Sequence, residues 1–244
     1  MNSVNPSSVK DVLVADWRTL DGLALVRAVL GQGHNLKVAV TSSFGAESAV
    51  LLDMVAQANP DAPILFVDTG KLFSETLEYR DTLIEHLRLT NVQTLRAPDV
   101  LVENSDADGT LFQNDPDACC HVRKVMPYAQ ACADFDVLIS GRKRHHGDLR
   151  STLDTAEHAG PHIKVNPLAH YSAADIEAAF EDRNLPRHPL VSAGYGSIGC
   201  APCTHKACAS KGARAGRWTG HKKTECGIHF NDDRVYQSLG DSNL

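Results

Sequence analysis

The sequence predicts an α/β fold in three layers, with helices on both faces of a mostly parallel sheet. Short β-rich runs alternate with amphipathic helical patterns along most of the chain. Its 244 residues are enough for one sizeable core, so we expect a single domain over residues 1–230. From residue 191 the periodicity stops and Gly, Pro, Cys and basic residues dominate. Residues 191–230 are therefore expected to be a loop-rich segment of that domain, and residues 231–244 a tail without an assigned role.

The element order follows from the hydrophobic patterns. Residues 9–30 are amphipathic and predict one or two helices. Further helices are expected at residues 46–58, 74–89 and 172–184. Ser74 and Ser172 are the expected N-cap residues of the last two helices. Strands are expected at residues 36–43, 62–70, 92–98, 135–141 and 162–168.

Composition narrows the class of protein. A formal net charge of −6 argues against a general nucleic-acid binder. The first ten residues contain no apolar core of a signal peptide, and no apolar run approaches the length of a membrane span. We therefore expect a cytoplasmic protein without a membrane partner. Its seven cysteines should then stay reduced, which favours metal ligation or thiol chemistry over disulfides.

Three loops at expected carboxyl ends of strands carry unusual residues: 42–48, 67–70 and 140–150. Ligands of open α/β sheets bind at this edge. The small hydroxyl residues and the glycine of "SSFGAES" would let backbone N–H groups face an anion at a helix N-terminus. An ordinary βα turn explains the same residues equally well.

The spacing of this loop also resembles the S-G-G-x-D-S loop of PP-loop ATP pyrophosphatases. Phe44 stands at the position of the second glycine, and Glu47 at that of the aspartate. A bulky Phe44 side chain would obstruct a pyrophosphate, so ATP cleavage by this loop is disfavoured.

Two runs of basic residues interrupt the acidic composition. They contain Arg142, Lys143, Arg144 and Arg150, and then Lys206, Lys211, Arg214, Arg217, Lys222 and Lys223. Either run alone is more simply explained as solvated surface. Two runs on a net-acidic chain, one of them after a strand, favour a local site for a phosphate or sulfate ester.

The cysteines carry the strongest signal. Cys119 and Cys120 are adjacent, and Cys200 and Cys203 have C-x-x-C spacing. Four soft ligands would hold either a structural zinc ion or an iron–sulfur cluster, and an adjacent pair is atypical of zinc sites. Cys132 lies in an apolar helical pattern and is expected to be a buried structural thiol. Cys208 is an alternative ligand.

Cys226 lies apart from both pairs, near the end of the chain. Lys222, Lys223 and His229 would favour its thiolate, whereas Glu225 opposes that shift. A thiolate in a basic segment near an anion site could attack an oxidised sulfur and be released by a second thiol.

Seven motifs together resemble the assimilatory adenylylsulfate (APS) and 3′-phosphoadenylylsulfate (PAPS) reductases, over roughly residues 35–230. They are "SSFGAES", "VDTG", "CCHVRK", "SGRKRHHGDLR", "GYGSIGCAPCT", "RAGRW" and "KTECGIH". The last motif is the most specific for the family, and the two cysteine pairs are typical of its cluster-bearing branch. The resemblance implies an adenine nucleotide α-hydrolase-like fold, which is related to the PP-loop enzymes.

The resemblance also implies a mechanism. Cys226 would attack the sulfur of the bound sulfonucleotide, expel AMP and form an S-sulfocysteine, from which thioredoxin or glutaredoxin would release sulfite. A [4Fe–4S] cluster on Cys119, Cys120, Cys200 and Cys203 would shape and polarise the site without delivering the electrons. The implied substrate contacts are Ser43, Phe44, Gly45, Thr69, Gly70, Arg123, Lys124, Gly141, Arg144, Arg150, Arg214, Arg217 and His229.

One motif departs from the family pattern. Family members commonly carry G-L-R-R-x-Q-S-x-x-R where this chain has "GRKRHHGDLR", so His146 and Gly147 replace Gln-Ser. The side-chain contacts of this loop are therefore less well defined than the class. Both cysteine pairs are present, which favours APS over PAPS as substrate. The sequence leaves a homo-oligomer open.

Two other classes stay open at this point. A zinc-stapled PP-loop enzyme that adenylates its substrate for sulfur transfer would use the same fold, although Phe44 and Glu47 count against it. A nucleotide-binding or redox-sensing module would bind APS without releasing sulfite.

Overall fold

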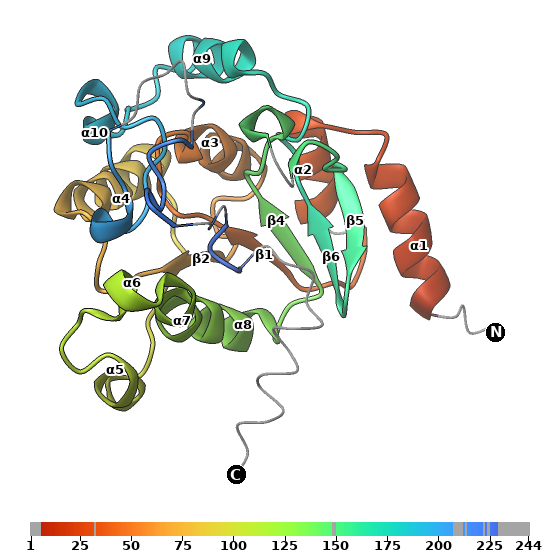
Figure 1. Cartoon of the computed structure of the whole chain (residues 1–244). Helices are drawn as coiled ribbons and strands as arrows, with labels where there is room; N and C mark the ends of the chain where they lie inside the picture. The colour runs from red at the N-terminus through yellow and green to blue at the C-terminus, as the bar shows by residue number, and fades with distance from the viewer. Residues whose placement is uncertain are drawn as a thin grey trace.

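A six-stranded sheet forms the centre of the molecule (Figure 1). The structure is a computed structural model, and it describes residues 6–31, 33–147, 150–206, 212, 214–221, 223 and 225–228. The strand order is β3-β2-β1-β4-β6-β5. The strands are β1 (Val38–Thr41), β2 (Ile64–Val67), β3 (Val92–Leu95), β4 (Val137–Ser140), β5 (Ala156–Ala159) and β6 (His162–Val165). All neighbouring pairs are parallel except β5 with β6, which confirms the predicted mostly parallel sheet.

Helices cover both faces of this sheet, as Figure 1 shows. Helices α2, α3 and α4 lie on one face, and α8 contacts β2 and β3 on the other. The helices with eight or more residues are α1 (Pro6–Trp17), α2 (Gly22–Leu30), α3 (Ser48–Ala58), α4 (Ser74–Leu87) and α9 (Ala173–Asp182). The shorter ones are α5 (Asp99–Ser105), α6 (Leu111–Asn114), α7 (Pro116–Cys120), α8 (Met126–Cys132) and α10 (Pro189–Ser192).

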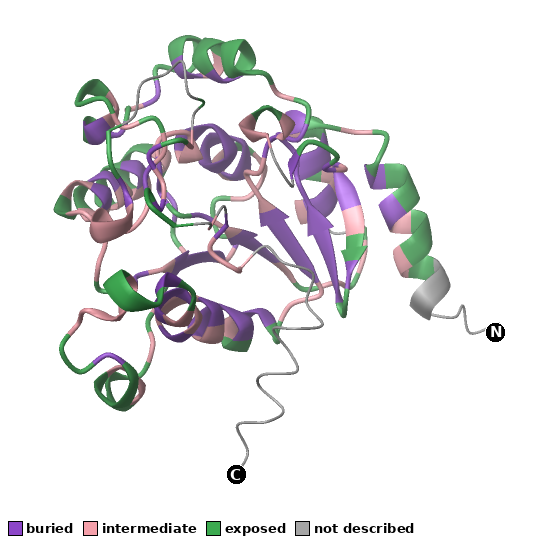
Figure 2. Cartoon of the chain, in the orientation of Figure 1, coloured by how far each residue is buried: buried purple, intermediate pink, exposed green. Residues whose placement is uncertain are grey.

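The alternation of side chains along each strand produces the three layers. Val40 and Ile64 belong to the large apolar cluster beneath α2 and α3, whereas their neighbours Ala39 and Leu65 pack against Tyr128 of α8. Most residues of the inner strands β1, β2, β4 and β6 are buried, as expected for a parallel sheet between helices, whereas the edge strands β3 and β5 are partly exposed (Figure 2). None of the described helices is both long and apolar enough to cross a membrane.

Most of the predicted elements are confirmed, with shorter strands than expected. The amphipathic run at 9–30 forms two helices. Ser172 caps α9 in a reciprocal capping box with Asp175. The prediction for Ser74 is wrong: Phe73 is the N-cap of α4, and the Ser74 hydroxyl donates to Glu75 instead.

Two features of the fold were not predicted. Strand β5 is a short antiparallel edge strand that joins β6 through a tight turn. Residues 99–132 form four short helices, of which the apolar helical pattern around Cys132 had indicated only α8, and a π-helical turn at His121–Val125 joins α7 to α8. Such wide turns often lie at functional sites because they redirect side chains.

The chain order explains where a ligand can bind. It passes from the central strand β1 outward to β2 and β3, and then returns to β4 on the other side of β1. The crossovers on the two sides of β1 therefore diverge, which leaves a crevice at the carboxyl ends of β1 and β4.

Candidate active site

A pocket lies at this crevice, at the carboxyl ends of β1, β2 and β4. Thr41, Val67 and Ser140, the last residues of those strands, line it. Its walls come from three loops: the one after β1, the one after β4, and the loop-rich segment that carries Cys226. Of the three loops that the sequence singled out, those at 42–48 and 140–150 meet at this pocket. The loop at 67–70 contributes only Val67, because Thr69 and Gly70 do not line the pocket.

The loop after β1 is a tight turn stabilised by its own hydroxyl groups. The Ser42 Oγ accepts a hydrogen bond from the Phe44 N–H at 3.2 Å, and the Ser48 Oγ accepts one from the Gly45 N–H at 2.8 Å. Ser43 and Gly45 line the pocket as predicted for a nucleotide loop.

Phe44 requires a correction. Its backbone is left-handed, with φ of 46°, and its fully buried side chain packs edge-to-face on Phe66 with ring centroids 5.3 Å apart. The side chain therefore belongs to the core, and a ligand could contact this residue only through its backbone. The steric argument against a pyrophosphate in this loop is wrong, because the ring points away from the pocket.

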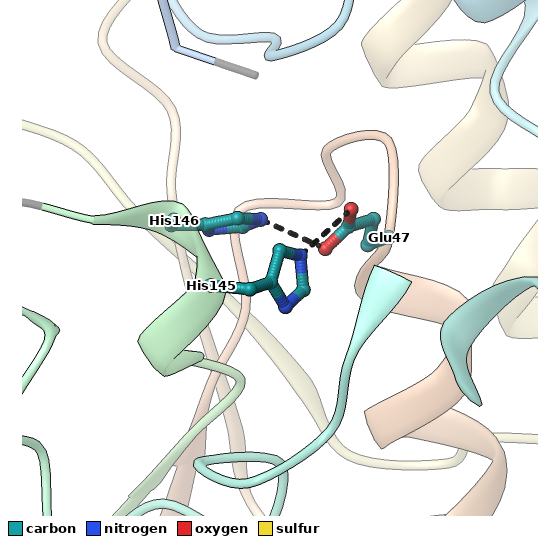
Figure 3. A group of neighbouring side chains, drawn as sticks. All are labelled: Glu47, His145 and His146. Atoms are coloured by element: carbon teal, nitrogen blue, oxygen red, sulfur yellow. Dashed lines mark ion pairs between the residues drawn. The ribbon is translucent and has the colours of Figure 1, made fainter. Parts of the chain in front are cut away.

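Glu47, at the start of α3, meets the loop after β4 (Figure 3). The Lys143 Nζ lies 2.7 Å from Glu47 Oε2, and the His146 Nε2 lies 3.1 Å from the same oxygen. Burial would raise the pKa of the Glu47 carboxyl, but His146 and Lys143 lower it to about 2. Glu47 is therefore a fixed negative charge among the basic side chains of the pocket.

In the described part of the chain, one set of three potential metal ligands has its ligand atoms within 4.8 Å of one another. It consists of Glu47, His145 and His146. Their partners do not fit a metal ion. The Lys143 ammonium already neutralises the carboxylate. The His146 Nδ1 lies 3.4 Å from Arg150 Nη1, which can only donate, so the ring proton of neutral His146 lies on the nitrogen that faces Glu47.

The segment that carries Cys226 is held over the pocket by Glu225. The buried Glu225 carboxylate accepts from Arg150 Nε at 2.7 Å and from Arg150 Nη2 at 2.9 Å. Arg214 Nη2 lies 3.2 Å from the same carboxylate. Cys226 itself is half-buried and lines the pocket, together with Lys124.

Two further arginines in the pocket have donors without partners. The Nε atoms of Arg142 and Arg217 are buried and have no hydrogen-bond partner among the described residues. The Arg217 guanidinium lies over the Trp218 ring at 4.4 Å. It also packs so closely on Gly199 that any Cβ there would meet it at 2.2 Å. These contacts hold the Arg217 side chain in place while leaving a donor for an anion.

Four cysteines gather behind the pocket. Cys119 and Cys120 end α7, whose N-cap Asp115 accepts from two backbone N–H groups. Burial, together with the charges of neighbouring thiols, raises the pKa of Cys119 to about 11, and burial raises the pKa of Cys120 to about 12. The charges of Cys200 and Cys203 both act on Cys119, so the two pairs face one another.

Cys200 has different partners. Its Sγ lies 3.2 Å from Thr69 Oγ1 and 3.9 Å from Lys124 Nζ. Burial opposes the thiolate, yet Lys124 and Thr69 lower the pKa of Cys200. Conversely, burial would lower the pKa of Lys124, but the thiols of Cys200, Cys226 and Cys120 raise it. Lys124 therefore lies between the four cysteines and the thiol of the pocket.

Of the remaining predicted contacts, Arg123 and Arg144 lie outside the pocket. Arg123 donates to Asp106 at 2.8 Å and to the Thr69 carbonyl at 3.1 Å, so it braces the turn beside Cys200. Arg144 donates to the Leu153 carbonyl at 2.6 Å and does not line the pocket. Gly141 does line it.

His229 lies outside the described residues, as do Lys222, Cys208 and residues 231–244. Arg142 and Lys143 belong to the basic run that the sequence assigned to an anion site, but neither they nor His146 were among the expected substrate contacts. The basic run after β4 was the available signal, but only the fold shows which of its side chains turn inward.

The fold and the site define an α/β nucleotide-binding enzyme whose anion pocket opens on a thiol. Comparison with solved structures supports the fold. Crystallised phosphoadenylyl-sulfate reductase from Candida auris, in a phosphate complex, superposes with a TM-score of 0.67 at 21% identity, over 84% of this chain and 99% of that one. Yeast FAD synthetase superposes with a TM-score of 0.50 at 14% identity, over 79% and 72%.

Sequence comparison identifies the family. Residues 37–206 match the phosphoadenosine phosphosulfate reductase domain. The adenosine 5'-phosphosulfate reductase of Mesorhizobium japonicum is 45% identical over 85% of this chain and 81% of its own length. That of Chelativorans sp. (strain BNC1) is 44% identical over 79% of each chain. The chain belongs to the phosphoadenosine phosphosulfate reductase domain family, and it is an oxidoreductase, as the resemblance of its motifs predicted.

Proposed function

We propose that this protein reduces APS to sulfite and AMP in sulfate assimilation, with a dithiol protein such as thioredoxin or glutaredoxin as the reductant. The observation that carries the proposal is that Cys226, Lys124 and Arg217 line one pocket at the carboxyl ends of the central strands. A thiol at an anion pocket is what displacement at a sulfonate sulfur needs. Curated relatives of the same family are named for this reaction.

The steps balance as a two-electron reduction. The Cys226 thiolate attacks the sulfur of APS, the bond from that sulfur to the phosphate oxygen breaks, and AMP leaves with the bonding electron pair. A thiolate of the reductant then attacks the Cys226 Sγ, releases sulfite and forms a mixed disulfide. The second thiol of the reductant resolves this disulfide, which restores Cys226 and leaves the reductant oxidised.

The pocket residues have distinct parts in these steps. Arg217 and Arg142 offer buried donors to the phosphosulfate group of APS, in which an oxygen links the phosphate to the sulfonate. Lys124, near both Cys226 and Cys200, would stabilise the thiolate and the charge that develops on the leaving phosphate. Ser43 and Gly45 belong to the loop expected to seat the nucleotide.

Cys119, Cys120, Cys200 and Cys203 would hold a [4Fe–4S] cluster, which supplies a polarising charge next to Lys124. The donor set fits a cluster better than a zinc ion. Tetrahedral zinc–thiolate bonds of about 2.3 Å bring the sulfurs to within about 4 Å of one another. Among the described residues, no three cysteine sulfurs form a set within 4.8 Å. The described thiols are therefore not gathered as tightly as the four ligands of one zinc ion.

The proposal is tested by a sulfite-release assay with reduced thioredoxin, using anaerobically purified protein whose iron and zinc have been measured. We expect brown protein with about four irons per chain, and sulfite from APS in preference to PAPS. The same assay with glutaredoxin ranks the two reductants.

Colourless protein with stoichiometric zinc would point to a zinc-stapled PP-loop enzyme. APS binding without sulfite release would contradict the reductase proposal and favour a nucleotide-sensing module. Equal rates with PAPS would overturn the substrate preference alone.

A further inference from the structure

The pocket contains a polar chain that the proposed function does not use. It runs from Lys143 and Glu47 through His146 and Arg150 to Glu225, the residue before Cys226. The links are 2.7 Å from Lys143 to Glu47, 3.1 Å from Glu47 to His146 and 3.4 Å from His146 to Arg150. Arg150 then meets Glu225 at 2.7 and 2.9 Å.

We propose that Glu225 is the positioning residue of Cys226, and that Arg150 is its docking site. This inference rests on the proposed function, in which the Cys226 sulfur must face the sulfonate of the nucleotide. Arg150 would then hold the enzyme's own carboxylate, and not a substrate anion as its place in the family motif implies.

The geometry of the pair supports this assignment. The side chains of Arg150 and Glu225 are 9% and 7% exposed, and the two hydrogen bonds are parallel and bidentate. Such a fork fixes both the distance and the orientation of the carboxylate. Because 75 residues separate the partners, the contact ties the segment to the sheet. It therefore restricts where the next residue, Cys226, can lie.

A second contact holds the other side of the thiol. Ile228 packs against the apolar cluster between the sheet and α8, which includes Leu65 and Tyr128. Cys226 therefore lies between the ion pair of its neighbour Glu225 and the apolar contact of Ile228, two residues further along the chain. Of these two contacts, the Glu225–Arg150 pair is the one that joins the polar chain of the pocket, because Arg150 also lies 3.4 Å from His146.

The charges around Glu225 explain why a carboxylate is needed. Arg150, Arg214 and Arg142 all act on Glu225 and, against the effect of burial, lower its pKa. Arg150 and Arg142 also repel each other's charge. An uncharged residue at position 225 would leave the buried Arg150 guanidinium without the carboxylate that it pairs with, so the segment would lose the ion pair that docks it.

The test measures docking without turnover. Iodoacetamide labelling of Cys226 is followed by peptide mass spectrometry in the full-length protein with AMP present. The variants are Glu225→Gln, Arg150→Met and the double variant, and Glu177→Gln is the control because its pair with Arg187 is exposed on α9. We expect each single variant to label Cys226 about tenfold faster, and the control to match the parent protein.

The double variant identifies a shared role. Residues that act as one unit give a double variant no faster than either single one, whereas independent effects would multiply to about a hundredfold. Circular dichroism establishes that every variant is folded. Labelling rates within twofold of the parent, or multiplicative effects, would overturn the proposal.

A parallel measurement separates this proposal from the proposed function. With APS and no reductant, Glu225→Gln should form the S-sulfocysteine adduct about tenfold more slowly, while its affinity for AMP changes less than about threefold. An adduct rate equal to that of the parent would also overturn the proposal. If the parent protein forms no adduct with APS, the reductase proposal fails, and the labelling rates still decide whether Glu225 positions Cys226.

Discussion

Two groups of cysteines lie on either side of Lys124: the four cysteines behind the pocket, and Cys226 alone. Their surroundings give the two groups different chemistry. Cys119 and Cys120 are buried at the end of a short helix, and their pKa values are raised to about 11 and 12. Cys226 is half-buried, lines the pocket and follows a carboxylate that docks on Arg150. A buried protonated thiol is a poor nucleophile, but a metal ion displaces its proton readily.

This difference indicates that the surroundings of each cysteine decide which chemistry its sulfur can perform. The four gathered thiols face one another, which suits a shared metal centre. The single thiol shares the pocket with Arg217, whose buried Nε has no hydrogen-bond partner among the described residues.

The largest effect should come from replacing one thiol of each group. Cys226→Ser is expected to keep its iron and bind AMP, yet to form no adduct with APS by intact-protein mass spectrometry, because the nucleophile is gone. Cys203→Ser should instead lose iron. If Cys226→Ser still forms the adduct, or if it loses iron, the two groups are not separate.

The next effect concerns Lys124, which both groups share. Lys124→Met should slow adduct formation by about 10²-fold, because a positioned cation that stabilises developing charge is lost. Rapid quenching and mass spectrometry measure the rate. Lys10→Met is the control, since Lys10 pairs with Asp136 at the opposite end of β4. A normal rate in Lys124→Met would restrict Lys124 to the four cysteines.

The pocket side can be tested by pH through Glu47. Its pKa is about 2 in the folded protein against 4.5 for the free side chain, so the unfolded state binds the proton first as pH falls. The folded state therefore gains about 3 kcal/mol above pH 4.5 and loses it between pH 4.5 and 2. Urea unfolding of metal-free protein should show a shallower acid loss for Glu47→Gln. Equal slopes would mean that Lys143 and His146 do not hold this carboxylate.

Two arginines near the two groups are expected to respond differently. Arg217→Ala should weaken AMP binding by about 1–3 kcal/mol in calorimetry, since its buried Nε has no hydrogen-bond partner among the described residues. Arg123→Ala should mainly lower the free energy of unfolding, because it leaves the buried Asp106 carboxylate with Lys71, 3.9 Å away, as its remaining cation among the described residues. The reverse pattern would show that the paired arginine is the one that binds the anion.

The sequence predicted the parts of the fold that have a strong period. Alternating and continuous apolar runs located five of the six strands, and the capping serine located α9. Strand β5 was missed because a four-residue edge strand with charged and polar positions has no distinctive pattern. The helices α5, α6 and α7 were missed because they are too short to show a period, although Asp115 and Pro116 are recognisable start signals for α7.

The sequence predicted which residues belong to the candidate site better than it predicted the contacts between them. The motifs identified Cys226 and the basic runs, but Glu225 was expected only to oppose the thiolate. Its partner Arg150 lies 75 residues earlier, and no local pattern indicates such a pair. Phe44 illustrates the same limit, because a single left-handed residue turned its side chain from the pocket into the core.

The smallest effect should come from the contact that links the two cysteine groups directly. Lys223, in the segment of Cys226, pairs with Asp117 at the start of the helix that carries Cys119. The Asp117 side chain is 78% exposed, so water already solvates the carboxylate. Asp117→Asn should therefore change the labelling rate of Cys226 by less than about fivefold, the equivalent of about 1 kcal/mol for an exposed pair.

This weak pair and the buried Glu225–Arg150 pair hold the same segment, so they form a matched comparison. Measured side by side, Asp117→Asn should fall well short of Glu225→Gln in the rate at which Cys226 is labelled, and it should leave the iron content unchanged. An effect of equal size would mean that the segment docks on the cysteine-bearing helix as firmly as on the pocket. The two groups of thiols would then move together, and the separation between them would be one of chemistry alone.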